Sequence, residues 1–324
     1  MKPLRFLPAA LAALASLTAS AADLRLGIVG TDTSHAPAFA RIFNDTAAKE
    51  HIPGARVVVA FKGGTADNPH SADRVDGYAE QIRTNYGVRF VDTIPALCEQ
   101  VDAVLLLSVD GRPHLEQVRP VIAARKPVFI DKPMAGSLRD VVEIFRLART
   151  AGVPMFSASS LRFGSNTLAA RAGAIGTITN ALTSSPCELE PHHPDLFWYG
   201  VHGTESLFTV LGPGCVSVQR GKTPAGKIEV SGVWTNGARG TFREDPKYGV
   251  SAEGTKGVMP VGNFDGYAPL AQEIMKFFRS GVSPVPPQET VEIFAFMEAA
   301  DESKRRGGKT VDVQQLLRDA GWKP

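Results

Sequence analysis

The sequence predicts a two-domain α/β protein, in which a doubly wound parallel sheet precedes an α+β domain with an open, mainly antiparallel sheet. Three observations predict this order. The chain has 324 residues, 44% hydrophobic and 21% charged, which is typical of ordinary globular domains. In the first half, short apolar segments alternate with stretches of helical period. After Ser159, short strand patterns are joined by Gly and Asn turns.

The first 21 residues carry the pattern of a secretory signal peptide. Lys2 and Arg5 precede an apolar, Ala-rich run from Phe6 to Thr18, and small residues follow at 19–21. The run is too short to span about 30 Å of hydrocarbon, so we expect no membrane anchor after cleavage. Because there is no adjacent arginine pair, we expect export through the general pathway to the periplasm or the medium.

The first domain is placed at residues 22–157. Continuous Val, Ile and Leu runs separated by helices are typical of a parallel sheet covered on both faces. The expected strands are 24–29, 55–61, 103–107, 128–130 and a last one near 153–157. Helical patterns lie between them, through Phe39, Ile42 and Phe43 and near 79–85, 115–124 and 138–151.

The second domain is placed at residues 158–324. Strands are expected at 230–234, 240–243 and 250–253, and two late helices at 270–279 and 289–305. We expect any homo-oligomer to form through this domain's open sheet.

Charge and cysteine content exclude several classes of protein. Cleavage after residue 21 removes Lys2 and Arg5 and leaves 33 basic against 33 acidic residues, so no basic field exists to bind nucleic acid. Three cysteines are too few for a disulfide framework or a thiolate zinc site. A bridge between Cys187 and Cys215 and a set of buried free thiols both remain open.

Two motifs resemble those of the Gfo/Idh/MocA oxidoreductase family. The segment 112–114, Arg-Pro-His, and a strand that ends in Asp131-Lys132-Pro133 resemble a family signature in which the strand ends in Glu-Lys-Pro. The segment 201–205, followed by Leu-Gly at 211–212, is similar to the family's His-x-x-Asp helix.

The resemblance implies a Rossmann domain, a second domain with an open sheet, and an active site in the cleft between them. The family's usual chemistry is hydride transfer between NAD or NADP and a sugar, a polyol or a related carbonyl compound. Lys132 and His202 are the implied catalytic residues. The implied cofactor-binding residues are Gly30, Thr31, Thr33, Ser34, His35, Lys62, Ser108, His114, Asp131 and Pro133.

The loop after the first strand departs from the family pattern Gly-x-Gly-x-x-Gly, because Asp32 and His35 replace its second and third glycines. A carboxylate repels a pyrophosphate unless it turns away or binds a cation, so we expect Asp32→Gly to tighten dinucleotide binding. Thr33 and Ser34 can still offer hydroxyls and amides at a helix start. A structural turn with Asp32 or Ser34 capping the helix is the alternative.

Lys62 follows the second strand, where an acidic residue usually binds the ribose of NAD. A lysine there suits the 2′-phosphate of NADP, and a solvent-facing lysine is the alternative.

Residues of the second domain supply the candidate substrate site. The candidates are Arg162, His193, Trp198, Tyr199 and Glu205. Alternatively, His193, His202 and Glu205 could hold a divalent metal, since imidazole and carboxylate suit zinc, manganese or iron.

Three functions follow from these residues. The first is an exported NAD(P)-dependent oxidoreductase acting on a sugar, polyol or glycoside, including transient oxidation at one carbon. The second is a nucleotide-independent lyase, hydrolase or isomerase on the same fold, with or without a metal. The third is a carbohydrate-binding protein without chemistry, which leaves the presence of both Lys132 and His202 unexplained.

Overall fold

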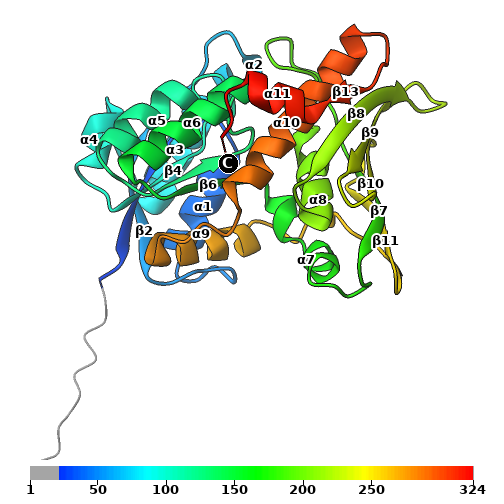
Figure 1. Ribbon diagram of the computed structural model, residues 1–324. Helices are drawn as coiled ribbons and strands as arrows, with labels where there is room; N and C mark the ends of the chain where they lie inside the picture. Colours follow the sequence, from blue (N-terminus) through cyan, green and yellow to red (C-terminus); the bar gives the residue numbers. More distant parts are fainter. Residues whose placement is uncertain (1–21, 324) are drawn as a thin grey trace, which may run out of the picture.

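The computed structural model describes residues 22–323, and the predicted signal peptide lies outside them. Two sheets face each other across a layer of helices (Figure 1). The first half of the chain forms one sheet with its helices, and the second half forms the other.

The first sheet has six parallel strands in the order β3-β2-β1-β4-β5-β6. They are β1 (Leu24–Val29), β2 (Ala55–Phe61), β3 (Arg89–Val91), β4 (Ala103–Leu106), β5 (Val128–Asp131) and β6 (Met155–Ala158). The helices between them are α1 (His35–Asn44), α2 (Pro69–Ala72), α3 (Val75–Tyr86), α4 (Ile94–Cys98), α5 (His114–Ala123) and α6 (Leu138–Ala151). The strand order reverses between β1 and β4, which is where ligands bind in doubly wound sheets.

The second sheet has seven strands in the order β12-β11-β7-β10-β9-β8-β13, and only the β7–β10 pair is parallel among the described residues. The strands are β7 (Ile178–Ser185), β8 (Cys215–Lys222), β9 (Ile228–Trp234), β10 (Arg239–Glu244), β11 (Gly249–Gly254), β12 (Gly257–Met259) and β13 (Val311–Asp312). A 3-10 turn at Ser160–Phe163 and α7 (Ser165–Arg171) connect the two sheets.

Four helices remain in the described part of the chain. Some lie between the two sheets, and one packs against the first sheet. They are α8 (Val201–Leu211), α9 (Ala268–Ser280), α10 (Pro287–Arg305) and α11 (Val313–Asp319). Phe208 of α8 packs on Trp234 and on Phe296 of α10, with ring centroids 5.3 and 5.7 Å away. Helix α9 instead joins the core of the first sheet, where Phe277 lies 4.9 Å from Phe156 (Figure 1).

The predicted fold class is confirmed. The structure adds strands that the sequence pattern did not mark, among them β3, β7 and β8. Cys98, Cys187 and Cys215 are buried free thiols, so the bridge between Cys187 and Cys215 is not formed. Within residues 22–323, no helix is both long enough and apolar enough to cross a membrane.

Candidate active site

A cleft of about 150 Å³ lies where the carboxyl edge of the first sheet meets the second half of the chain. Basic and aromatic side chains dominate its wall, and no described Asp or Glu lines it. The lining residues are Thr33, Ser34, His35, His70, Arg74, Val109, Lys132, Ser160, Leu161, Trp198, Tyr199, His202, Tyr248, Phe264 and Tyr267.

Lys132 enters this cleft directly after β5. Its side chain is 9% exposed, and its ammonium lies 5.8 Å from the centre of the Tyr199 ring. The Nζ atom has no hydrogen bond or ion pair within residues 22–323. Burial lowers the pKa of Lys132, and the neighbouring Asp131 carboxylate opposes this shift only in part. An unpaired cation in such a place can bind a substrate oxygen or give up its proton.

His202 reaches the cleft from the first turn of α8. Its Nδ1 lies 2.7 Å from the Ser159 hydroxyl, just beyond β6. Burial, followed by the charges of Lys132 and His35, lowers the pKa of His202 well below its ordinary value. The imidazole is therefore neutral at neutral pH and can accept a proton.

His35 and Asp131 form a buried pair at the same edge. The Asp131 Oδ2 atom lies 2.5 Å from Nδ1 of His35. Burial alone would raise the pKa of the Asp131 carboxyl, but His35 and Lys132 hold it below its ordinary value. The carboxylate is therefore charged, and it orients an imidazole that lines the cleft.

Behind the cleft, Arg162 lies in a buried cluster of charges. It bonds to Glu205 through Nε and to Glu289 through Nη1, the latter at 2.6 Å. Arg171 also bonds to Glu289, at 2.9 Å through each of its two terminal nitrogens. Arg162 and Glu205, both predicted to bind substrate, therefore bind each other and do not line the cleft.

Residues 64–72, which we call the strap, cross over the end of β1. The Asn68 amide donates to Asp110 at 3.3 Å, and Arg112 holds Asp67 at 2.8 Å. Asp110 and Arg112 follow β4, and the strap follows β2. Because β1 lies between β2 and β4, these bonds span its carboxyl end.

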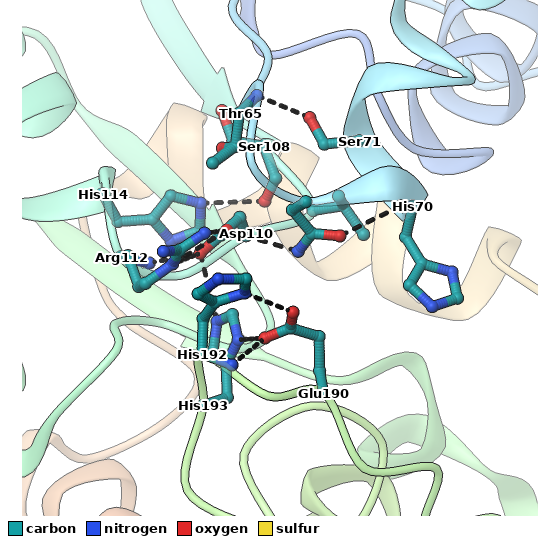
Figure 2. Close-up of polar contacts among 12 residues, drawn as sticks. Thr65, His70, Ser71, Ser108, Asp110, Arg112, His114, Glu190, His192 and His193 are labelled. Atoms are coloured by element: carbon teal, nitrogen blue, oxygen red, sulfur yellow. Dashed lines mark hydrogen bonds and ion pairs between the residues drawn. The ribbon is translucent and has the colours of Figure 1, made fainter.

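His193 links this region to the second half of the chain. Its Nε2 lies 3.1 Å from Asp110 Oδ1, and its Nδ1 lies 2.6 Å from Glu190 Oε2 (Figure 2). Burial lowers the pKa of His193, but the two carboxylates raise it more, so the net pKa is above its ordinary value. The two acids thus favour the protonated form of His193, which is not in the cleft lining.

Comparison with known proteins finds a family to which the first half of the chain is similar. Residues 24–159 match the profile of the oxidoreductase family with an NAD-binding Rossmann fold. The match spans less than half of the chain, and over this stretch the chain is similar to the Gfo/Idh/MocA family. Inositol 2-dehydrogenase of Mycolicibacterium gilvum is 30% identical over 141 residues, which cover 43% of this chain and only 36% of that enzyme.

Solved dehydrogenase structures share the fold over nine-tenths of this chain. A probable dehydrogenase from Thermotoga maritima superposes with a TM-score of 0.71 at 18% identity, covering 90% of this chain and 100% of that one. Apo scyllo-inositol dehydrogenase from Lactobacillus casei gives 0.73 at 15% identity over 91% and 99%. Lactobacillus casei myo-inositol dehydrogenase with NAD(H) and myo-inositol gives 0.69 at 15% over 90% and 96%. At these identities the likeness shows the fold alone.

The crevice in which the Rossmann fold takes a dinucleotide does not fit one in this arrangement. Gly30 has φ +90°, and a Cβ there would lie 2.6 Å from Ser108 Cα, so this glycine packs directly against the residue after β4. The Thr31 hydroxyl is bonded to the carbonyls of Lys62 and Val75. The remaining cleft is smaller than the roughly 300–1,000 Å³ of ordinary ligand pockets.

Asp32 stands at the second glycine position of the dinucleotide loop. It is fully buried and accepts hydrogen bonds from the Ser71 hydroxyl at 2.6 Å and the Val109 amide at 3.0 Å. Burial raises the pKa of Asp32, and these bonds oppose the shift. The carboxylate therefore does not repel a pyrophosphate through direct contact, as the sequence led us to expect. It points toward Ser71 and Val109, and the strap covers it. Neither Asp32 nor Ser34 caps α1 with its side chain.

The other residues predicted from the Gfo/Idh/MocA resemblance divide between cleft and interior. Seven line the cleft: Thr33, Ser34, His35, Lys132, Trp198, Tyr199 and His202. His114 is buried, with its ring nitrogens against the carbonyls of Ser108 and Met134. Lys62 forms a 2.5 Å ion pair with Asp76 at the surface. Gly30, Thr31, Ser108, Asp131 and Pro133 support the cleft from behind without lining it.

The alternative metal site is not assembled. No group of three or more metal-binding side chains occurs among residues 22–323. Of the three proposed ligands, His193 pairs with Asp110, Glu205 with Arg162, and His202 with Ser159.

Several cleft residues were not singled out from the sequence. His70 and Arg74 come from the strap and the start of α3, and Tyr248, Phe264 and Tyr267 come from loops of the second half. The Asn-Pro pair at 68–69 was the available signal for a short helix after β2.

Proposed function

We propose that this protein is an exported oxidoreductase that acts on a sugar, a polyol or a glycoside. The observation that carries the proposal is the convergence of Lys132 and His202 on one buried cleft between the two sheets. The match of residues 24–159 to the Gfo/Idh/MocA family and the likeness to inositol dehydrogenases support a polyhydroxylated substrate.

The side chains of the cleft suit the handling of hydroxyl groups. The unpaired Lys132 ammonium can bind a substrate oxygen and stabilise negative charge that develops on it. The neutral His202 can form a hydrogen bond with a substrate hydroxyl. Trp198 and Tyr199 offer the aromatic surface on which sugar rings pack. The chain alone thus explains binding and proton transfer, and redox turnover additionally requires the strap to leave the crevice.

The test uses the mature chain, residues 22–324. NAD⁺ and NADP⁺ are titrated by calorimetry, and reduction is then followed with a panel of inositols, aldoses and glycosides. Saturable binding and turnover that Lys132→Met abolishes support the proposal. Absence of both nucleotide binding and nucleotide-linked turnover contradicts it.

The closed crevice favours a second candidate, a nucleotide-independent lyase, hydrolase or isomerase. Asp32, Ser71 and Asn68 occupy the space over β1 and satisfy one another and their neighbours without a ligand. The same substrate panel, assayed by mass spectrometry on protein freed of nucleotides, separates the candidates. Conversion that persists without NAD(P) and is lost in Lys132→Met supports the second.

Export is tested on the full-length chain. We expect the protein to accumulate outside the cytoplasm with a mass that matches cleavage after residue 21. An uncleaved chain retained in the cytoplasm contradicts export and leaves the enzymatic proposals untouched.

A further inference from the structure

We propose that His35, oriented by Asp131, is the proton acceptor of the cleft. The proposal rests on the proposed function only in requiring that the cleft converts a hydroxylated substrate. His35 occupies the place of the third glycine in the family's dinucleotide loop, and Asp131 the place of the glutamate in the strand-end signature. These two departures from the family pattern are therefore joined in one hydrogen-bonded pair.

The hydrogen-bond inventory fixes which nitrogen of His35 carries the proton. An ionised carboxylate only accepts hydrogen bonds, so the Nδ1 atom facing Asp131 must be the donor. In the neutral ring the lone pair is then on Nε2. The carboxylate therefore selects the tautomer whose free nitrogen is a base.

The free nitrogen is available to a substrate. His35 lines the cleft, and its Nε2 atom has no hydrogen-bond partner within residues 22–323. This unpaired nitrogen is not one of the fully buried ones among the described residues, so it is accessible from the cleft. The titratable groups around it are Asp131 at the end of β5, Lys132 directly after it, His202 of α8, and Tyr267 before α9, whose ring lies 4.7 Å away.

His202 does not have its tautomer fixed in this way. Its Nδ1 faces the Ser159 hydroxyl, which can donate or accept. Asp131 leaves no such choice to His35. The third imidazole of the cleft, His70, has Arg74 near its Nδ1 and Glu188 near its Nε2, each at 3.5 Å. Of the three, only His35 combines a carboxylate on one nitrogen with a second nitrogen that has no partner among the described residues, and this geometry is that of an oriented general base.

The proton-transfer step balances within the described residues. The O–H bond of the substrate breaks, its proton forms a bond to His35 Nε2, and the electron pair remains on the substrate oxygen. The Asp131 carboxylate stabilises the resulting imidazolium, and the Lys132 ammonium stabilises the alkoxide. Whichever reaction follows begins from that alkoxide.

A first experiment reads the tautomer without any substrate. In mature protein labelled with ¹⁵N at histidine, nuclear magnetic resonance should show His35 protonated at Nδ1 and bare at Nε2. In Asp131→Asn, whose amide can donate, we expect the proton to move to Nε2. A wild-type ring protonated at Nε2 alone overturns the proposal even if the enzyme is active.

A second experiment reads the chemistry on a substrate found in the panel. His35→Gln should lower kcat by roughly 10²–10⁴ with little change in KM, and should alter the pH profile of kcat. His51→Gln is the matched control, because His51 lies beyond the far end of α1, against the Ile42 carbonyl. Circular dichroism checks that each variant folds.

The outcomes separate this inference from the function that it deepens. An active His35→Gln variant with an unchanged pH profile overturns the role of His35 and leaves the proposed function standing. Failure of the whole panel contradicts the proposed function, and the tautomer measurement still decides whether Asp131 orients a base.

Discussion

The residue that most distinguishes this cleft is Lys132, whose ammonium group is buried without a hydrogen-bond partner among the described residues. Lys132 bears the desolvation cost of its charge with only Asp131 close enough to offset it. Such a group is stabilised when a substrate oxygen approaches, so its energetic role is expressed in the complex and not in the free protein.

We predict that Lys132→Met and His202→Ala each lower the rate by roughly 10²–10⁴, because both act on one substrate hydroxyl. The double variant should be little slower than the poorer single variant, since groups that act as a unit do not contribute additively. A double-mutant cycle on kcat/KM measures this. Strictly additive losses would assign the two residues to separate steps.

Asp32 carries a second prediction at this scale. Asp32→Gly removes the acceptor of the Ser71 hydroxyl and the Val109 amide, and should destabilise the protein by about 1–3 kcal/mol without tightening dinucleotide binding. Urea unfolding and calorimetry measure the two effects. Glu50→Gln on the exposed surface is the control, with a change expected within about 0.5 kcal/mol. Tighter binding at unchanged stability would restore the repulsion model.

The residues show where sequence reasoning worked and where it stopped. Lys132 and His202 could be placed on one cleft, because a strand end and a helix start fix their positions. The partners of Arg162 could not be foreseen, since Glu205 and Glu289 lie 43 and 127 residues away in the chain. The direction in which Asp32 turns depends on Ser71, which is equally nonlocal.

At the scale of elements, the strap is the feature that the strand and helix pattern did not reveal. Long apolar strands such as β1, β2 and β4 announce themselves through their composition. The strap has four helical residues and is held by polar side chains, which leave no periodic signal. Strands β7 and β8 were missed for a related reason, because each has an exposed face with Thr, Ser, Asn or Gln.

We predict that Arg112→Gln loosens the strap, because Arg112 holds both Asp67 and Asp110. Amide hydrogen exchange of residues 64–72 should become faster, while exchange in β9 stays unchanged. If a dinucleotide enters beneath the strap, the same substitution tightens its binding, since less must be broken to admit it. Faster exchange together with unchanged or absent nucleotide binding favours the nucleotide-independent candidate.

At the scale of the whole molecule, the His193 link joins the loop after β4 to the second half of the chain. The pKa of His193 is raised in the fold, so protonated His193 stabilises the native state. This contribution is complete below the unfolded pKa of about 6.5 and is lost as pH rises through the higher folded value.

We therefore predict that the free energy of unfolding falls as pH is raised from about 6.5 through that folded value. Urea unfolding over a pH series measures the fall, and His193→Gln should flatten it. A wild-type curve that matches the His193→Gln curve over this range would falsify the link's electrostatic role.

The position of helix α9 has a consequence for folding during synthesis. The family match ends at residue 159, but the core beneath α1 and β6 is closed by Leu270, Ile274 and Phe277. Each of these side chains contributes about 1.5–3 kcal/mol when buried. After residue 159, the ribosome must therefore synthesise more than 100 further residues before the hydrophobic core of the first sheet is complete. A nascent chain that cannot complete its core early stays unfolded for longer, which is compatible with the proposed export of an unfolded chain through a translocation pore.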